Sequence, residues 1–144
     1  MTEKKESART FDPVWEEIYG RREQLNRYPV DGVISFLFRN RSRLAANGPL
    51  RVIEVGCGAC NNLWFAAREG CDVAGIDGSE AAIEFGRARF AEEKLDGDLR
   101  VGDFTELPFE DCTFDVAINR AALTQTGLTA ARKAVDEVAR VVRP

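Results

Sequence analysis

The sequence predicts a doubly wound α/β domain, in which a mostly parallel sheet of strand order 3-2-1-4 is covered by helices on both faces. Two observations support this fold. Short apolar runs rich in β-branched residues alternate with longer segments of helical spacing, as parallel strands alternate with crossover helices. The first run, residues 51–55, ends at Gly56 and Gly58, and Asn61 and Asn62 then open a helix. Such a strand–turn–helix unit presents bare backbone N–H groups to a ligand.

The composition is that of one soluble globular domain. The chain has 144 residues, of which 44% are hydrophobic and 31% charged, so it can bury a core of its own. A formal net charge of -4 offers no electrostatic attraction to nucleic acid. No apolar run approaches the length of a membrane span, and residues 2–9 are too polar for a signal peptide. We therefore expect a cytoplasmic protein with neither a nucleic-acid nor a membrane partner.

Two helices are predicted before the sheet, after a charged tail at residues 1–10. Asp12 and Pro13 are typical of the N-cap and first position of a helix. Asp31 is expected to cap a second helix, which ends at the stop signal of residues 47–49. We divide the chain into an N-terminal tail and helical segment, residues 1–30, and a main domain, residues 31–144.

The later strands each end in polar residues. Residues 72–77 form the second strand and end at Asp77, about twenty residues past the glycines, where an acidic residue meets ribose hydroxyls in such folds. Ser79 is expected to cap the helix that follows. The third strand, residues 99–104, ends in Gly-Asp-Phe, and the fourth covers residues 113–119. An ordinary loop carboxylate is the alternative interpretation of Asp77.

The glycine turn and its neighbours carry a resemblance to a known family. Glu54-x-Gly56-x-Gly58 resembles the signature loop of class I S-adenosylmethionine-dependent methyltransferases. The dinucleotide pattern G-x-G-x-x-G would need a third glycine where Asn61 stands. A carboxylate at Glu54 would also repel a pyrophosphate but not a sulfonium amino acid. The sequences at residues 107–109, Leu-Pro-Phe, and 114–116, Phe-Asp-Val, closely resemble the family's sequence around the fourth strand.

This resemblance implies a Rossmann-like fold that binds S-adenosyl-L-methionine across the carboxyl ends of the strands. In the family, the acidic residue lies near the amino-acid end of the cofactor, the glycines cradle it, and the Gly-Asp-Phe carboxylate takes the adenine amine. The cofactor-binding residues implied here are Glu54, Gly56, Gly58, Asp77, Gly78, Asp103, Phe104 and Asn119. Gly78 departs from the bulky apolar residue often found there, which predicts a thinner adenine platform. N-terminal helices often form a lid in the family, so Tyr19 and Tyr28 are lid candidates, although core or rim aromatics are the better interpretation of each alone.

We interpret the chain as an enzyme of methyl transfer from S-adenosylmethionine to a small-molecule acceptor. The motif requires no catalytic residue; Asn119 and Arg120 are candidates, because they follow the fourth strand near the expected methyl position, and a solvated loop cation is the alternative for Arg120. The sequence has no histidine, so a His-centred triad is excluded. A non-catalytic cofactor-binding or interaction module remains the alternative. A nicotinamide dehydrogenase is disfavoured because the third glycine is missing and because the sequence has no His or Tyr-x-x-x-Lys acid–base set.

Two further expectations concern cysteines and assembly. Cys57 and Cys60 form a C-x-x-C, but the sequence has no second such pair and no histidine, so we expect reduced thiols and no metal site. The resemblance, which covers residues 31–144, lacks the fifth to seventh strands of the family, so the domain is expected to be truncated. An apolar edge on the fourth strand then predicts a homodimer or other self-association, or cover by another polypeptide or the final helix.

Overall fold

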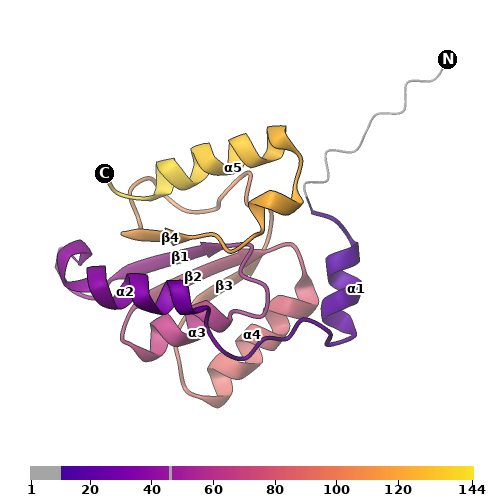
Figure 1. The fold of residues 1–144 in the computed structure, drawn as a ribbon, viewed down its shortest axis with the longest axis horizontal. Coiled ribbons are helices and arrows are strands. Elements are labelled where there is room, and N and C mark those ends of the chain that lie inside the picture. The colour runs from indigo at the N-terminus through magenta and orange to yellow at the C-terminus, as the bar shows by residue number, and fades with distance from the viewer. Residues whose placement is uncertain (1–10, 46) are drawn as a thin grey trace.

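The computed structural model describes residues 11–45 and 47–144. Its sheet has four parallel strands in the order β3-β2-β1-β4, which confirms the predicted fold class and strand order (Figure 1). The strands are β1 (Arg51–Val55), β2 (Asp72–Asp77), β3 (Asp98–Val101) and β4 (Val116–Ile118). The predicted charged tail, residues 1–10, lies outside the described residues.

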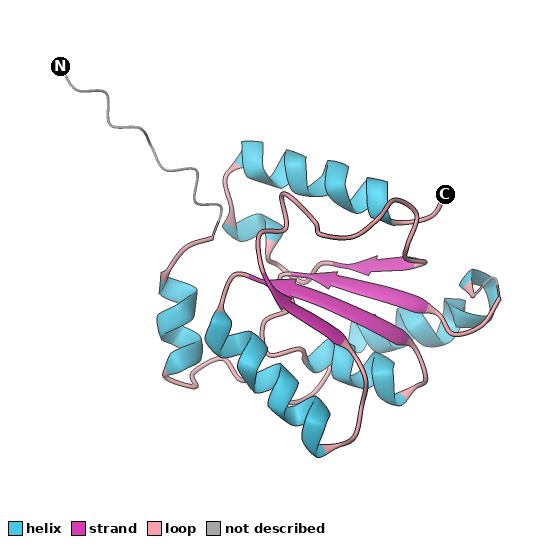
Figure 2. Cartoon of the chain, turned by 180° about the vertical axis from the view of Figure 1, so that it is seen from behind, coloured by secondary structure: helices cyan, strands magenta, loops and turns pink. Residues whose placement is uncertain are grey.

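Helices cover both faces of the sheet, as a doubly wound fold requires (Figures 1 and 2). The N-terminal helix lies beside the carboxyl ends of the strands. The helices are α1 (Val14–Gly20), α2 (Asp31–Leu44), α3 (Asn61–Arg68), α4 (Glu80–Glu92) and α5 (Leu128–Val141), with a 3₁₀ turn η1 (Leu123–Gln125). Helices α2, α3 and α4 share the first face, and α5 covers the second.

The core has two layers because β1 is apolar on both faces. Val52 packs with Leu63 of α3 and Ile83 of α4 on one side of the sheet. Ile53 packs with Val141 of α5 on the other. All five side chains have no exposed surface. Such burial on both faces is typical of a central parallel strand, and it leaves the carboxyl ends of the strands as the place where polar groups gather.

The helix starts were predicted with mixed success. Ser79 caps α4 as expected, its Oγ accepting a hydrogen bond from the backbone N–H of Ala82 at 3.1 Å. The expectation for Asp31 was wrong: Asp31 is the first residue of α2, and the cap position is Val30. Helix α1 begins at Val14, one residue later than expected. The side chain of Asp12 accepts a hydrogen bond from the backbone N–H of Val14 at 3.0 Å.

The outer edge of β4 is partly covered by the chain itself. The strand is shorter than predicted, spanning Val116–Ile118. Before it, Phe114 forms a parallel bridge with Val142, and the N–H of Phe114 donates to the carbonyl of Val141 at 2.9 Å. The segment after α5 therefore lies alongside the residues just before β4. Within the described residues, no helix has both the length and the apolar character needed to cross a bilayer.

Candidate functional site

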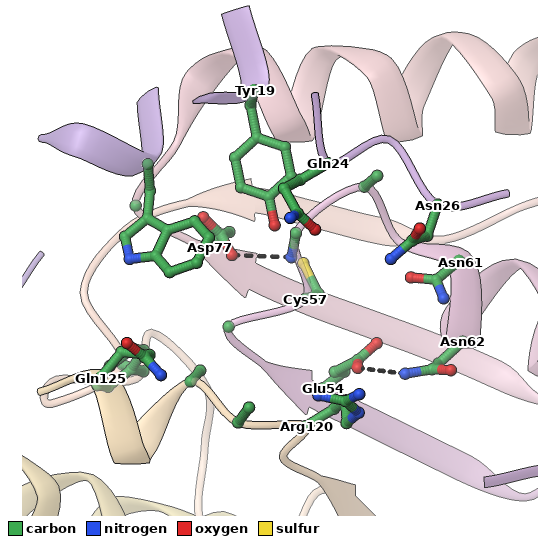
Figure 3. A pocket seen from close by; sticks show the side chains of 18 of the residues that line it. Tyr19, Gln24, Asn26, Glu54, Cys57, Asn61, Asn62, Asp77, Arg120 and Gln125 are labelled. Atoms are coloured by element: carbon green, nitrogen blue, oxygen red, sulfur yellow. Dashed lines mark hydrogen bonds between the residues drawn. The ribbon is translucent and has the colours of Figure 1, made fainter. Parts of the chain in front are cut away.

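A cavity of about 260 Å³ opens at the carboxyl ends of the strands (Figure 3). The glycine turn after β1 forms its floor, and the N-terminal segment, the end of β2 and the loop after β4 form its walls. These segments are far apart in the sequence and meet because parallel strands end at the same edge of a sheet. Open α/β sheets bind their ligands at this edge.

The glycine turn needs its glycines for both conformation and space. Gly56 and Gly58 have φ of +68° and +51°, a region that side chains adopt only under strain. A Cβ on Gly56 would overlap the side chain of Ala122, and a Cβ on Gly58 would overlap the hydroxyl of Tyr19. Close packing over the bare backbone is thus part of how the cavity is closed.

The C-x-x-C pair packs beneath this turn. Cys57 and Cys60 are buried free thiols, and the thiol of Cys60 donates to the sulfur of Cys57 at 3.6 Å. A Cβ on Gly75 would lie 2.8 Å from the sulfur of Cys57, and one on Gly86 would lie 2.7 Å from that of Cys60. The two sulfurs therefore fill space left by glycines of β2 and α4. The hydrogen bond with Cys60 and burial raise the pKa of the Cys57 thiol.

Glu54 is a buried carboxyl group with one oxygen unpartnered. Its side chain lines the cavity and is 2% exposed. Oε1 accepts a hydrogen bond from the amide of Asn62 at 2.7 Å, whereas Oε2 has no hydrogen-bond partner within the described residues. Burial raises the pKa of Glu54 to about 8, and the charge of Asp77 adds to this, against the hydrogen bond from Asn62. A buried, unsatisfied carboxyl oxygen in a cavity fits a cationic ligand group.

Asp77 is held rigidly at the end of β2. Its Oδ2 accepts from the N–H of Gly58 at 2.8 Å, and its Oδ1 accepts from the N–H of Ser79 at 2.9 Å. Burial raises the pKa of Asp77, while these two hydrogen bonds lower it. A carboxylate oxygen has two lone pairs, so each oxygen can accept a further hydrogen bond from a ligand.

Helix α1 is attached to the site through Glu16. The carboxylate accepts hydrogen bonds from Ser79 Oγ at 2.5 Å and from the N–H of Ala81 at 3.1 Å, at the first turn of α4. A carboxylate is favoured there by the unpaired N–H groups and the helix dipole. Trp15 and Tyr19 line the cavity from the same helix. Burial raises the pKa of Tyr19, so its hydroxyl stays protonated at neutral pH.

Most of the predicted site residues come together. Seven line the cavity: Glu54, Gly56, Gly58, Asp77, Gly78, Phe104 and Arg120. Asp103 and Asn119 are exposed and outside its lining. Oδ1 of Asp103 accepts from the N–H and hydroxyl of Thr105, both at 2.8 Å, and the amide of Asn119 donates to the carbonyl of Val55 at 3.1 Å.

The aromatic groups near the cavity differ from the expectations. Tyr28 is 77% exposed and does not line the cavity, whereas Tyr19 does. The space left by Gly78 is filled by the ring of Phe11, which also lines the cavity. Where the sequence predicted a thinner surface at Gly78, an aromatic side chain from the N-terminal segment therefore fills the space.

Sequence reasoning missed the residues that attach the N-terminal segment to the sheet. Glu16 carries no local motif, and its hydrogen bonds reach Ser79 and Ala81, more than sixty positions later. Gln24 and Asn26, which line the cavity, carry no local motif either. Asn62 stands in the predicted first turn of a helix, but nothing local distinguishes it from Asn61, which is only half-buried.

Comparison with known proteins gives a consistent assignment. The family described as "Methyltransferase domain" matches residues 52–144. A demethylmenaquinone methyltransferase from Corynebacterium kroppenstedtii is 34% identical over 142 residues, covering 97% of this chain and 56% of that protein. The chain spans about half the length of these curated relatives.

Solved structures share the fold. One, from work on the conversion of a disulfide bond into a thioacetal group during echinomycin biosynthesis, superposes with a TM-score of 0.74 at 22% identity, covering 91% of this chain and 56% of that one. A SAM-dependent methyltransferase from Methanosarcina mazei superposes with a TM-score of 0.64 at 24% identity, covering 72% and 52%. At these identities the likeness establishes the architecture.

Proposed function

Since the chain belongs to the class I S-adenosylmethionine-dependent methyltransferase family, we propose that its cavity binds S-adenosylmethionine and that it transfers the methyl group to a small-molecule acceptor. The observation that carries the proposal is Oε2 of Glu54, which is buried in the wall of the cavity and has no hydrogen-bond partner among the residues that the structure describes. An ammonium group supplies the charge-assisted hydrogen bond that this oxygen lacks.

The other lining residues fit the remaining parts of the cofactor. Asp77 presents free lone pairs beside the glycine turn, which suits the two hydroxyls of a ribose. Phe104 and Phe11 offer apolar surfaces for an adenine ring. Asp103 is proposed to take the adenine amine, from the turn that follows β3.

The cofactor would supply an electrophilic methyl group, and the chain's own residues would position and enclose it. Trp15 and Tyr19 wall the cavity from α1, and Ala122 packs on Gly56 from the loop after β4. Positioning of the reacting groups and exclusion of water supply much of the rate of such a transfer. Arg120 lines the cavity and is the better placed of the two catalytic candidates, because Asn119 lies outside the lining.

Calorimetry tests the proposal with three ligands: S-adenosylmethionine, S-adenosylhomocysteine and NAD. We expect the first two to bind. We expect Glu54→Gln to lower the affinity for S-adenosylmethionine, because the ammonium group of the ligand loses its charged partner. Preference for NAD would overturn the proposed cofactor. Release of S-adenosylhomocysteine in the presence of a panel of small phenols, quinols and amines tests transfer. Cofactor binding without turnover on any acceptor would favour the non-catalytic module.

A further inference from the structure

Asn62 makes two hydrogen bonds in opposite directions. It lies in the first turn of α3 and is 2% exposed. Its Nδ2 donates to Oε1 of Glu54 at 2.7 Å (Figure 3). Its Oδ1 accepts from the backbone N–H of Val30 at 2.9 Å. One amide thus joins the end of β1 to Val30, which lies 32 positions before Asn62 in the chain.

The segment held in this way covers the cavity. Gln24 and Asn26 line the cavity just before Val30, and Val30 itself lines it. The neighbouring Asn61 also holds the segment, donating from Nδ2 to the carbonyl of Tyr28 at 2.6 Å. Asn61 and Asn62 therefore both hold the segment in place, but of the two only Asn62 also donates a hydrogen bond to Glu54.

We propose that Asn62 is a positioning residue that fixes both the orientation of the Glu54 carboxyl group and the place of the covering segment, residues 24–30, over the cavity. The proposal deepens the proposed function and rests on it, because Glu54 is the group assigned to the ammonium end of the cofactor. With Oε1 engaged by Asn62, Oε2 is the oxygen left for the ligand. The segment that closes over that ligand is held by the same amide.

An amide suits this position better than a carboxylate or an apolar side chain. A primary amide carries two N–H donors and a carbonyl acceptor in one plane, so it can serve Glu54 and Val30 at once. A carboxylate could accept from Val30, but it could pair with Glu54 only while Glu54 keeps its proton, and it would repel the ionised form that binds a cation. An apolar side chain would leave both partners buried and unsatisfied, which is costly.

The charges around Glu54 make the donor important. Asp77 faces it from β2 and raises its pKa, and the thiol of Cys57 and the hydroxyl of Tyr19 also lie close enough to interact with its charge. Arg120 lines the same cavity from the loop after β4. The hydrogen bond from Asn62 favours the ionised form of Glu54, which is the form that binds a cation.

The test substitutes each asparagine by aspartate. Asn62→Asp keeps the acceptor for Val30 and loses the donor to Glu54. Asn61→Asp is the matched control, with the same chemistry and charge change one residue away. We expect the pKa of Glu54, followed by ¹³C NMR of its carboxyl carbon, to rise by about one unit or more beyond the shift in the control. Equal shifts in the two variants would overturn the proposal.

A reversal variant keeps the test decisive if Asn62→Asp folds poorly. Glu54→Gln combined with Asn62→Asp exchanges the amide and the carboxylate, so the hydrogen bond can form with its polarity reversed. We expect Asn62→Asp to lower the melting temperature, and we expect the double variant to recover at least half of that decrease. No recovery would contradict a direct bond between the two side chains.

Cofactor affinity separates this proposal from the proposed function. We expect the double variant to fold but to bind S-adenosylmethionine at least tenfold more weakly than the wild type, because the carboxylate stands in the wrong place. If the wild type binds no S-adenosylmethionine, the proposed function fails while the NMR titration still decides the role of Asn62. Wild-type affinity in the double variant would show that the position of the carboxylate does not matter.

Discussion

The carboxylate of Asp77 accepts a hydrogen bond from the backbone N–H of Gly58 at 2.8 Å, which ties the end of β2 to the glycine turn after β1. The bond joins the two elements that the sequence assigned to one cofactor. It also means that a change at either residue affects the position of the other. The first two predictions follow from this pair.

Gly58→Ala should lower both stability and cofactor affinity. Its φ of +51° makes any side chain strained, at a cost of about 1–2 kcal/mol, and the new Cβ would displace the hydroxyl of Tyr19. Gly70→Ala is the matched control, because Gly70 has φ of +84° with nothing within 4 Å of a Cβ. We expect both variants to melt at lower temperature in calorimetry, and only Gly58→Ala to lose S-adenosylmethionine affinity. Equal affinities in the two variants would contradict a role for the turn in binding.

Asp77→Asn should weaken cofactor binding by about 1–3 kcal/mol, the scale of losing hydrogen bonds to a charged acceptor. The amide keeps an acceptor for only one of the two backbone N–H groups, of Gly58 and Ser79, so part of the loss comes from the weakened turn. Asp72→Asn, at the exposed amino end of the same strand, provides the control. Titration calorimetry measures the difference, and an unchanged affinity in Asp77→Asn would remove the ribose assignment.

Glu54 should make stability fall as the pH rises. Its pKa is raised from 4.5 to about 8 in the folded chain, so between these values the unfolded chain loses its proton first and the folded state binds more protons. The free energy of unfolding therefore decreases with pH across this window, by a few kcal/mol at most. Urea unfolding at pH 5 and pH 9 should show that Glu54→Gln removes this loss.

The matched control for this pH dependence is Glu92→Gln, on the exposed surface of α4. We expect it to retain the wild-type dependence, because Glu92 does not line the cavity that holds Glu54. A Glu54→Gln variant with an unchanged difference between the two pH values would show that Glu54 ionises normally.

Glu16→Gln should loosen α1. The variant replaces a charge at the first turn of α4, where the carboxylate accepts from Ala81 and Ser79. Glu17→Gln is the control, since Glu17 is exposed and pairs with Arg21 at 3.4 Å. We expect trypsin to cleave the segment after α1 several-fold faster in Glu16→Gln alone. Equal cleavage rates would mean that α1 is held by its apolar contacts.

Self-association through the edge of β4 stays a prediction. On the side away from β1, the described residues show one bridge beside this strand, between Phe114 and Val142. Strand edges with unpaired backbone groups favour pairing with another chain. Light scattering over a dilution series should show a mass that falls toward that of the 144-residue monomer. A constant monomer mass at high concentration would contradict it.

The sequence by itself determined the sheet and the floor of the site. Strand order followed from alternating apolar runs and helical segments, and the turn from Gly56 and Gly58, because these signals are local and repeat along the chain. Asp77 was placed correctly at the carboxyl end of its strand. Parallel strands bring such ends together whatever the side chains between them.

Only the tertiary structure decided how the site is closed. The bond from Ser79 to Glu16 spans 63 positions and that from Val30 to Asn62 spans 32, so neither follows from local spacing. The unpartnered oxygen of Glu54 likewise depends on Asn62 taking the other one. Local periodicity determines which elements form and in what order, whereas long-range polar contacts depend on the distance and direction of side chains in the folded core.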